Sequence, residues 1–261
     1  MDAAQILLVG GGAFLAGGMN AIAGGGTFFS FPALLAAGVP PVMANASNTV
    51  AMWPASLSSA WAYRREVSRH PRWTLLLVLV SLIGGISGSL LLLATSNAAF
   101  SRLVPWLLLV ATSLFAFSGQ ISRGVAAAKA RLGLGAKAAG TPGGLGGLVF
   151  QTIVAIYGGF FGAGMGILTL AALAIQGVDD MQELNGLKNL TSAVNYTVAA
   201  ATFIIAGAIS WPHTLLMIAT AMAGAFAGAA FARRLPAVWL RRLVVAVGGV
   251  LSLIYFIKTY A

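Results

Sequence analysis

The sequence predicts an all-α polytopic membrane protein made of two inverted repeats of about five hydrophobic segments each. Two observations support this prediction. Of the 261 residues, 59% are hydrophobic and only 8% are charged, whereas a soluble domain carries about 25% charged residues. Glycines also interrupt the hydrophobic segments at two places, residues 24–26 and 162–166. We therefore expect about eight full spans plus short broken helices, arranged as glycine-broken helical hairpins.

The first half begins with an apolar segment at residues 5–23. After the glycine break, residues 28–37 reach only about half of the 20 residues that a full span requires. The segment at 43–63 then opens with amides and hydroxyls, and two further spans follow at 73–94 and 101–120.

The second half repeats this plan, with segments at 143–161, 167–176, 183–206, 213–232 and 238–258. We therefore divide the single membrane domain into three parts, which are an N-terminal repeat at 1–120, a basic linker at 121–141 and a C-terminal repeat at 142–261.

Landmarks of the two halves recur in the same order at offsets of 139–141 residues, which favours an internal repeat over chance. The matching pairs are Gly38 with Gly177, Gly84 with Gly224, Gly88 with Gly228, Arg102 with Arg242, and Asn48 with Asn189.

The basic residues predict the orientation, because cytoplasmic loops of membrane proteins are enriched in Lys and Arg. Thirteen of the fifteen Lys and Arg residues lie inside if the loop 64–72, the linker, the start of the 183–206 segment and the turn 233–242 are cytoplasmic. Both termini are then outside. Each glycine-broken pair must be a hairpin that returns to its starting side, so the two halves are inverted copies, as in many secondary transporters.

The glycine breaks predict an anion site. A half-helix that starts after a break presents free N–H groups and the positive end of its dipole. Two inverted half-helices aim both positive ends at one central point, which suits an anion held by backbone N–H groups and neutral amide or hydroxyl donors. The candidate binding residues are Gly24, Gly25, Gly26, Thr27, Ser47, Asn48, Thr49, Gly162, Gly164, Gly166, Lys188, Asn189, Thr191 and Ser192, with Asn20 and Asn195 as weaker members.

Glycine and asparagine in membrane helices also have purely structural roles. Glycines allow close helix packing, and we prefer that interpretation for Gly84, Gly88, Gly224 and Gly228. The apolar runs that follow the glycines at 24–26 and 162–166 are too short to span a membrane, so at these two places we favour the anion site over a packing role. Buried Asn and Ser often only join helices, and for the individual side chains both interpretations stay open.

The charged residues of the second half allow two interpretations. Lys188 lies about 8 Å along its predicted helix, shallow enough to reach the cytoplasmic surface or to attract an anion. Asp179, Asp180 and Glu183 lie where a helix begins, so we expect them to cap its free N–H groups.

Other classes of function are disfavoured. The chain has no cysteine, only two histidines, no HExxH motif and no P-loop, so we expect no enzyme activity, no metal and no cofactor. Its net charge of +10 is spread over short clusters between apolar runs, which disfavours nucleic acid as a partner. The expected partners are the lipid bilayer and a small anionic substrate, and a homodimer is left open.

Several motifs resemble the TauE/SafE sulfite exporter family, and together they cover nearly the whole chain. They are residues 23–27, 32–35, 38–40 and 46–51 in the first half, and 185–190, 206–212 and 232–236 in the second. The resemblance implies a multi-pass transporter of the bacterial inner membrane that exports sulfite, sulfoacetate or related organosulfonates. Where the family's second motif is most glycine-rich, this chain has Ala163 and Met165.

The sequence thus predicts a secondary exporter of small anions that works by alternating access. A membrane-embedded assembly or interaction protein, whose polar centre is only structural, is the alternative from another class. An anion channel with the same site is a third interpretation.

Overall fold

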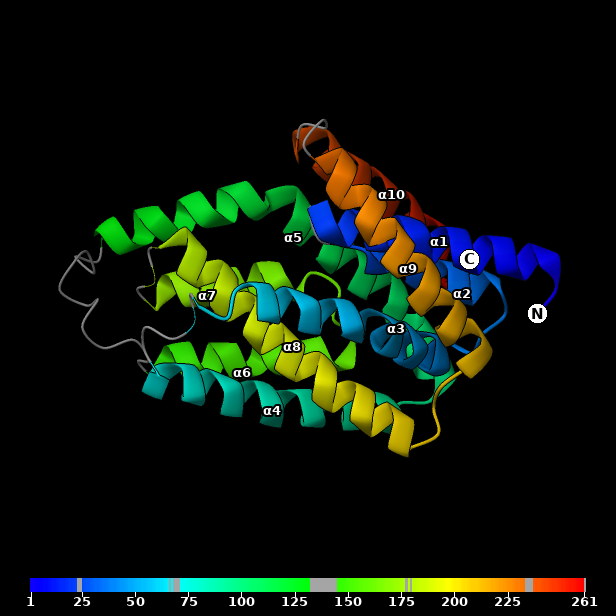
Figure 1. The fold of residues 1–261 in the computed structure, drawn as a ribbon, viewed down its shortest axis with the longest axis horizontal. Helices are drawn as coiled ribbons and strands as arrows, with labels where there is room; N and C mark the ends of the chain where they lie inside the picture. Colours follow the sequence, from blue (N-terminus) through cyan, green and yellow to red (C-terminus); the bar gives the residue numbers. More distant parts are fainter. Residues whose placement is uncertain are drawn as a thin grey trace.

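The computed structural model describes residues 1–22, 25–65, 67, 71–131, 145–176, 178, 180–232 and 237–260, and these form ten helices and no strand (Figure 1). The helices are α1 (Ala3–Ile22), α2 (Thr27–Ala36), α3 (Pro41–Ala62), α4 (Pro71–Ala94), α5 (Asn97–Arg131), α6 (Leu145–Phe160), α7 (Met165–Ile175), α8 (Met181–Ile205), α9 (Trp211–Ala232) and α10 (Ala237–Tyr260).

Helices α1 and α2 form an antiparallel hairpin. A Cβ on Gly12 would lie 2.6 Å from Cβ of Ala33, and a Cβ on Gly26 would overlap the carbonyl oxygen of Ala16. Residues late in α1 therefore face the start of α2, and earlier residues face its end. Since α2 has only ten residues, it is about 15 Å long, half the thickness of a bilayer core of about 30 Å.

Helices α6 and α7 form the second hairpin in the same way. Gly147, near the start of α6, packs against the side chain of Gln176 after α7, and Gly158 packs against Met165 at the start of α7. Both glycine-broken segments are thus helical hairpins, as the sequence predicts.

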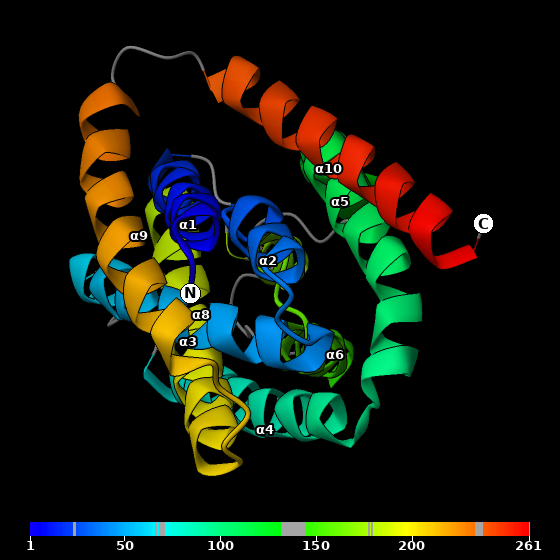
Figure 2. The same cartoon turned by 90° about the vertical axis from the view of Figure 1, so that its right-hand side faces the viewer.

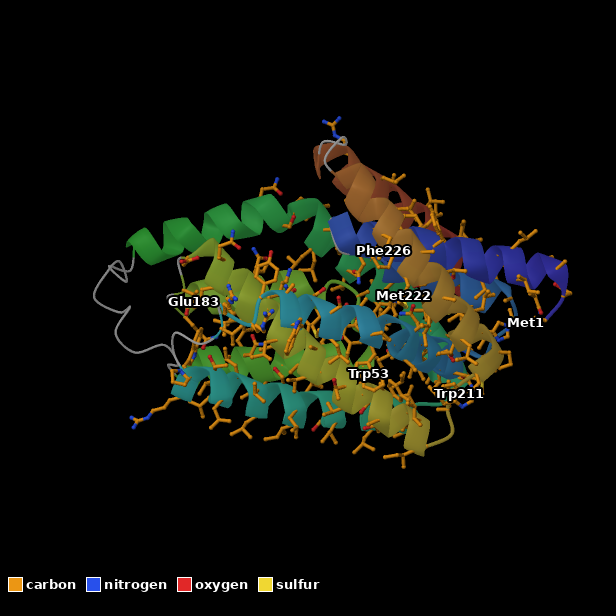
Figure 3. All side chains as sticks on the ribbon, in the orientation of Figure 1. Met1, Trp53, Glu183, Trp211, Met222 and Phe226 are labelled. Carbon is orange, nitrogen blue, oxygen red and sulfur yellow. The ribbon has the colours of Figure 1, made fainter. Side chains whose placement is uncertain are left out.

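Helices α3 and α8 cross each other in the middle of the molecule, running in opposite directions. The indole Nε1 of Trp53 donates a hydrogen bond to Oγ1 of Thr197 at 2.9 Å. In Figure 3, Glu183 at the start of α8 lies at the end of the molecule where α5 terminates, whereas Trp211 and Met1 lie at the opposite end.

Helices α9, α4, α5 and α10 surround α2 and α3 (Figure 2). Large apolar side chains on this outer surface are exposed, among them Ile83 on α4, Phe226 on α9 and Leu253 on α10. Apolar groups that face outward on several helices are expected where lipid, rather than water, surrounds a protein.

Glycine sets the distance between α1 and α9 and between α4 and α6. A Cβ on Gly224 would overlap the carbonyl oxygen of Phe14, and one on Gly228 would lie 2.6 Å from Cα of Gly18. A Cβ on Gly84 would lie 2.5 Å from Cβ of Ala155, and Gly88 is similarly crowded by α6. The packing role that the sequence predicts for these four glycines is confirmed.

Four helices of the described residues are long and apolar enough to cross a membrane, namely α1, α4, α5 and α10. Helix α5 is longer than the expected span at 101–120, since it begins at Asn97 and continues to Arg131. Its added end is rich in alanine, the residue with the highest helix propensity, so part of the expected linker is helical. The remainder of that linker, residues 132–141, lies outside the described residues.

Candidate substrate site at the broken helices

The hydroxyl of Tyr196, on α8, lies between the two glycine breaks. It interacts with the side chain of Thr27, the first residue of α2, and a Cβ on Gly162 would lie 3.7 Å from it. Phe31 of α2 and Phe161 at the second break meet edge to face, with ring centroids 5.5 Å apart. The two breaks, 137 residues apart from Gly25 to Gly162, are therefore neighbours in space.

Both breaks depend on left-handed backbone that glycine adopts without strain. The φ angles are +83° at Gly25, +79° at Gly162 and +78° at Gly164, the residue that precedes α7. Gly26 has no room for a side chain, as described above. Gly24 lies outside the described residues.

A buried hydrogen bond joins the first half-helix, α2, to α3. The hydroxyl of Ser30 on α2 donates to Oδ1 of Asn48, and both side chains are buried. Oγ of Ser47 accepts a hydrogen bond of 2.9 Å from the backbone N–H of Ser210, just before α9. Thr49 donates to the carbonyl of Asn45 within its own helix. Ser47 and Asn48 thus join separate elements, whereas Thr49 is satisfied locally.

At the second half-helix, Lys188 lies against the first turn of α7. The position of a Cβ on Gly166 is 3.6 Å from Cδ of Lys188, whose side chain is half-buried. The N-terminal end of a helix carries a partial positive charge, so the ammonium and the helix end both favour a negatively charged ligand. The start of α8 is capped by Asp180, which accepts hydrogen bonds from the N–H groups of Gln182 and Glu183. Asp180 therefore caps as predicted, and Asp179 lies outside the described residues.

A narrow cavity lies beside this turn, between α4, α6, α7 and α8. It has no room for a water-sized sphere. The lining residues are Ser81, Gln151, Ala155, Met165, Thr169, Thr191 and Asn195. Thr191 and Asn195 belong to the set predicted from sequence, whereas Ser81, Gln151 and Thr169 do not.

Asn48 and Asn189, which the sequence pairs by their offset, do not meet. The Trp53–Thr197 hydrogen bond marks the crossing of α3 and α8. Asn48 lies five residues before Trp53, and Asn189 lies eight residues before Thr197. Because α3 and α8 are antiparallel, these two distances add, and the two asparagines are separated by about 20 Å along the helix axes. Asn189 and Ser192 are half-buried, and Asn20 is exposed.

The family model of the sulfite exporter TauE/SafE matches residues 9–255. No solved structure matches the chain.

Several curated relatives are membrane proteins by name. A probable membrane transporter protein of Haemophilus influenzae is 30% identical over 83% of this chain and 80% of its own length. The probable membrane transporter protein ORF9 of a Sinorhizobium species is 28% identical over 92% of this chain and 88% of its own length. The probable membrane transporter protein YfcA of Escherichia coli K12 is 25% identical over 92% and 85%. With its apolar helices, this chain is a multi-pass membrane protein, and it belongs to the TauE/SafE sulfite exporter family.

Proposed function

We propose that this protein is a secondary transporter that exports small anions, sulfite or an organosulfonate such as sulfoacetate, across the bacterial inner membrane. The observation that carries the proposal is the position of Lys188 beside Gly166, in the first turn of α7. A cation and a helix N-terminus then act on the same space. The chain has only five acidic residues, and none of those that the structure describes lines the adjacent cavity.

The packing of the helices supports two inverted halves. If α1–α5 are matched in order with α6–α10, most contacts between the halves have a counterpart. The contact of α1 with α9 corresponds to that of α6 with α4, the contact of α3 with α9 to that of α8 with α4, and the contact of α5 with α7 to that of α10 with α2. The α3–α8 and α5–α10 contacts map onto themselves. In this proposal eight helices span the membrane, α2 and α7 are the half-helices, and the termini are outside. Rocking of one half against the other opens the site alternately to each side.

The membrane potential is sufficient to drive this export. Moving one charge through 100 mV changes the free energy by about 2.3 kcal/mol. A dianion that leaves a negative cytoplasm therefore gains about 4.6 kcal/mol, which supports a concentration ratio on the order of a thousandfold. No ATP is required.

The experiment that tests the role of Lys188 is sulfite efflux from proteoliposomes containing Lys188→Gln, with Lys258→Gln as the control. Lys258 lies in the last turn of α10, far along the chain from either glycine break. We expect Lys188→Gln to lower the initial rate at least about tenfold, while Lys258→Gln stays within about twofold of wild type. Equal rates in folded Lys188→Gln and wild-type protein would contradict the proposal.

A further inference from the structure

The last two turns of α3 leave the core of the bundle. The side chains from 44 to 52 are all buried, whereas Leu57 is 44% exposed and Trp61 is 69% exposed. In Figure 2 this end of α3 reaches the edge of the bundle. A helix of 22 residues is about 33 Å long, so if it begins at one surface of a hydrocarbon core of about 30 Å it ends at the other. Trp61, one residue before the end of α3, then lies at the membrane interface.

The side chain of Arg64, two residues after α3 ends, is held in one orientation by Trp61. Its Cζ lies 4.5 Å from the centroid of the indole ring, which is the geometry of a cation–π interaction. Its Nη1 also donates a hydrogen bond of 2.9 Å to the carbonyl oxygen of Trp61. A guanidinium has five N–H groups, and Arg64 is exposed. The other N–H groups are therefore presented in a fixed orientation beside the indole.

The exposed face of this helix end has the polarity of a phospholipid. Leu57 and Trp61 are four residues apart, so they share one face of α3, and the guanidinium of Arg64 stacks on the last of them. A phospholipid carries its groups in the same order, with acyl chains in the hydrocarbon and a phosphate at the surface. Tryptophan is enriched at this level of membrane proteins because its ring has an apolar body and a polar N–H. The two apolar side chains suit an acyl chain, and the guanidinium suits a phosphate.

The segment that follows α3 selects the charge of the lipid. Residues 64–72 contain four arginines and one glutamate. One of these arginines, Arg72, is the second residue of α4 and is exposed. Basic side chains near a membrane surface attract anionic headgroups, whereas a zwitterionic headgroup has no net charge to attract. This end of α3 therefore favours an anionic lipid.

An exposed indole alone does not produce this arrangement. Trp106 on α5 is 52% exposed, but its ring packs edge to face on Phe256, with centroids 4.9 Å apart. Its Nε1 donates a hydrogen bond of 3.2 Å to the hydroxyl of Tyr260. Within the part of the chain that the structure describes, no cation stacks on Trp106. The stacked arginine thus distinguishes Trp61 from a tryptophan that only anchors its helix at the interface.

We propose that Leu57, Trp61 and Arg64 form a binding site for one anionic phospholipid. The phosphate accepts hydrogen bonds from the guanidinium of Arg64, whose planar fork matches the geometry of phosphate oxygens. An acyl chain lies along Trp61 and Leu57. This inference goes beyond the proposed transport function and does not depend on which anion is carried.

The test measures lipid binding to the detergent-solubilised protein by native mass spectrometry. Dioleoyl phosphatidylglycerol and dioleoyl phosphatidylcholine have the same acyl chains and differ in headgroup charge. We expect wild-type protein to bind one phosphatidylglycerol at least about tenfold more tightly than phosphatidylcholine. Arg64→Gln should weaken phosphatidylglycerol binding about fivefold, which corresponds to about 1 kcal/mol, the contribution of one basic residue at a membrane surface. Trp61→Leu keeps an apolar side chain but removes the surface under the guanidinium, and should weaken binding by at least about twofold.

Arg102→Gln is the matched control, because Arg102 is an exposed arginine near the start of α5. It should leave phosphatidylglycerol binding within about twofold of wild type. Equal losses in Arg64→Gln and Arg102→Gln would show only general attraction between charges, and this result would overturn the site, as would unchanged binding in folded Arg64→Gln. Glycerol 3-phosphate carries the phosphate without acyl chains, and we expect it to leave the lipid in place. If it displaces the lipid, Arg64 binds free phosphate and the lipid assignment is wrong. Displacement by sulfite would instead assign this end of α3 to the transport path.

Discussion

The indole N–H of Trp53 bonds to the hydroxyl of Thr197 at 2.9 Å, and this contact fixes the point where α3 crosses α8. Because the two helices run in opposite directions, the crossing places Asn48 and Asn189 on opposite sides of it. Asn48 holds a half-helix at one depth, and Asn189 lies beside Lys188 at another. The two asparagines are therefore expected to have different roles, although their positions in the two halves correspond.

Asn48→Ala should destabilise the protein. The substitution leaves the hydroxyl of the buried Ser30 without the acceptor that joins α2 to α3. The Ser30 hydroxyl keeps its 3.3 Å hydrogen bond to the carbonyl of Gly26, so the expected cost is that of one buried hydrogen bond, about 0.5–1.5 kcal/mol. Asn189→Ala changes a half-buried side chain and should cost less than about 0.5 kcal/mol. Thermal unfolding in detergent, with both variants side by side, measures the difference.

The control for this bond is the double variant Ser30→Ala/Asn48→Ala. Its destabilisation should be clearly smaller than the sum of the two single changes, because both remove the same interaction. Strict additivity would show that the Ser30–Asn48 bond contributes no coupling energy.

Gly17→Ala should destabilise the contact between α1 and α9. A methyl group at Gly17 would overlap the carbonyl oxygen of Ala221, so the helices must separate. Gly11→Ala, on the same helix, is the matched control because nothing lies within 4 Å of its added Cβ. Alanine favours a helix over glycine by about 1 kcal/mol, so Gly11→Ala should be neutral or stabilising. If both variants unfold at the same temperature, α1 and α9 do not pack as closely at Gly17 as the structure shows.

Gly164→Ala should impair transport more than it impairs stability. Both Gly164 and Gly38 have positive φ angles, +78° and +84°, and alanine in this conformation costs about 1 kcal/mol. A Cβ meets only ordinary contacts at Gly164 and nothing within 4 Å at Gly38. Gly164→Ala and Gly38→Ala should therefore lose similar stability, while only the former, at the start of α7, slows sulfite flux. Equal sulfite flux in the two variants would show that the second glycine break, at 162–166, has no role in transport.

Much of the fold follows from the sequence, because each helix depends on local pattern. Short apolar runs after the glycine breaks correctly indicate short helices, and the crowded contacts of Gly84 and Gly224 confirm the packing role assigned to them. The Gly/Ala-rich composition of 121–131 was less informative, since alanine also favours helix and α5 continues through it.

The site was harder to predict, because it depends on which faces of the helices meet. A lone hydroxyl such as Ser81 in an apolar span carries no signal until α4 is packed against α6. Tyr196 resembled any aromatic core residue in the sequence, and only the hairpins bring Thr27 and Gly162 to it. Gln151 did offer a signal, since it is an amide in the middle of an apolar helix of 16 residues.

The absence of native cysteine allows a direct test of alternating access. Ala155 is 3% exposed and lines the cavity, so Ala155→Cys introduces a single thiol at the centre of the membrane domain. We expect a membrane-impermeant maleimide to label it in both right-side-out and inside-out vesicles, because each side gains access in turn. Cysteine at Ala172, fully buried on α7 and outside the cavity lining, should resist labelling from both sides. If Ala155→Cys is labelled from neither side, the polar centre is closed to both sides and has only a structural role.

The most direct test of the account is the current carried by wild-type protein in proteoliposomes under an imposed potential, with sulfite, sulfate, acetate and sulfoacetate compared. The account predicts a saturable current with sulfite or sulfoacetate that reverses direction with the potential. No current with any of these anions, from protein shown to be folded, would contradict the claim that the polar centre beside Lys188 carries anions across the membrane.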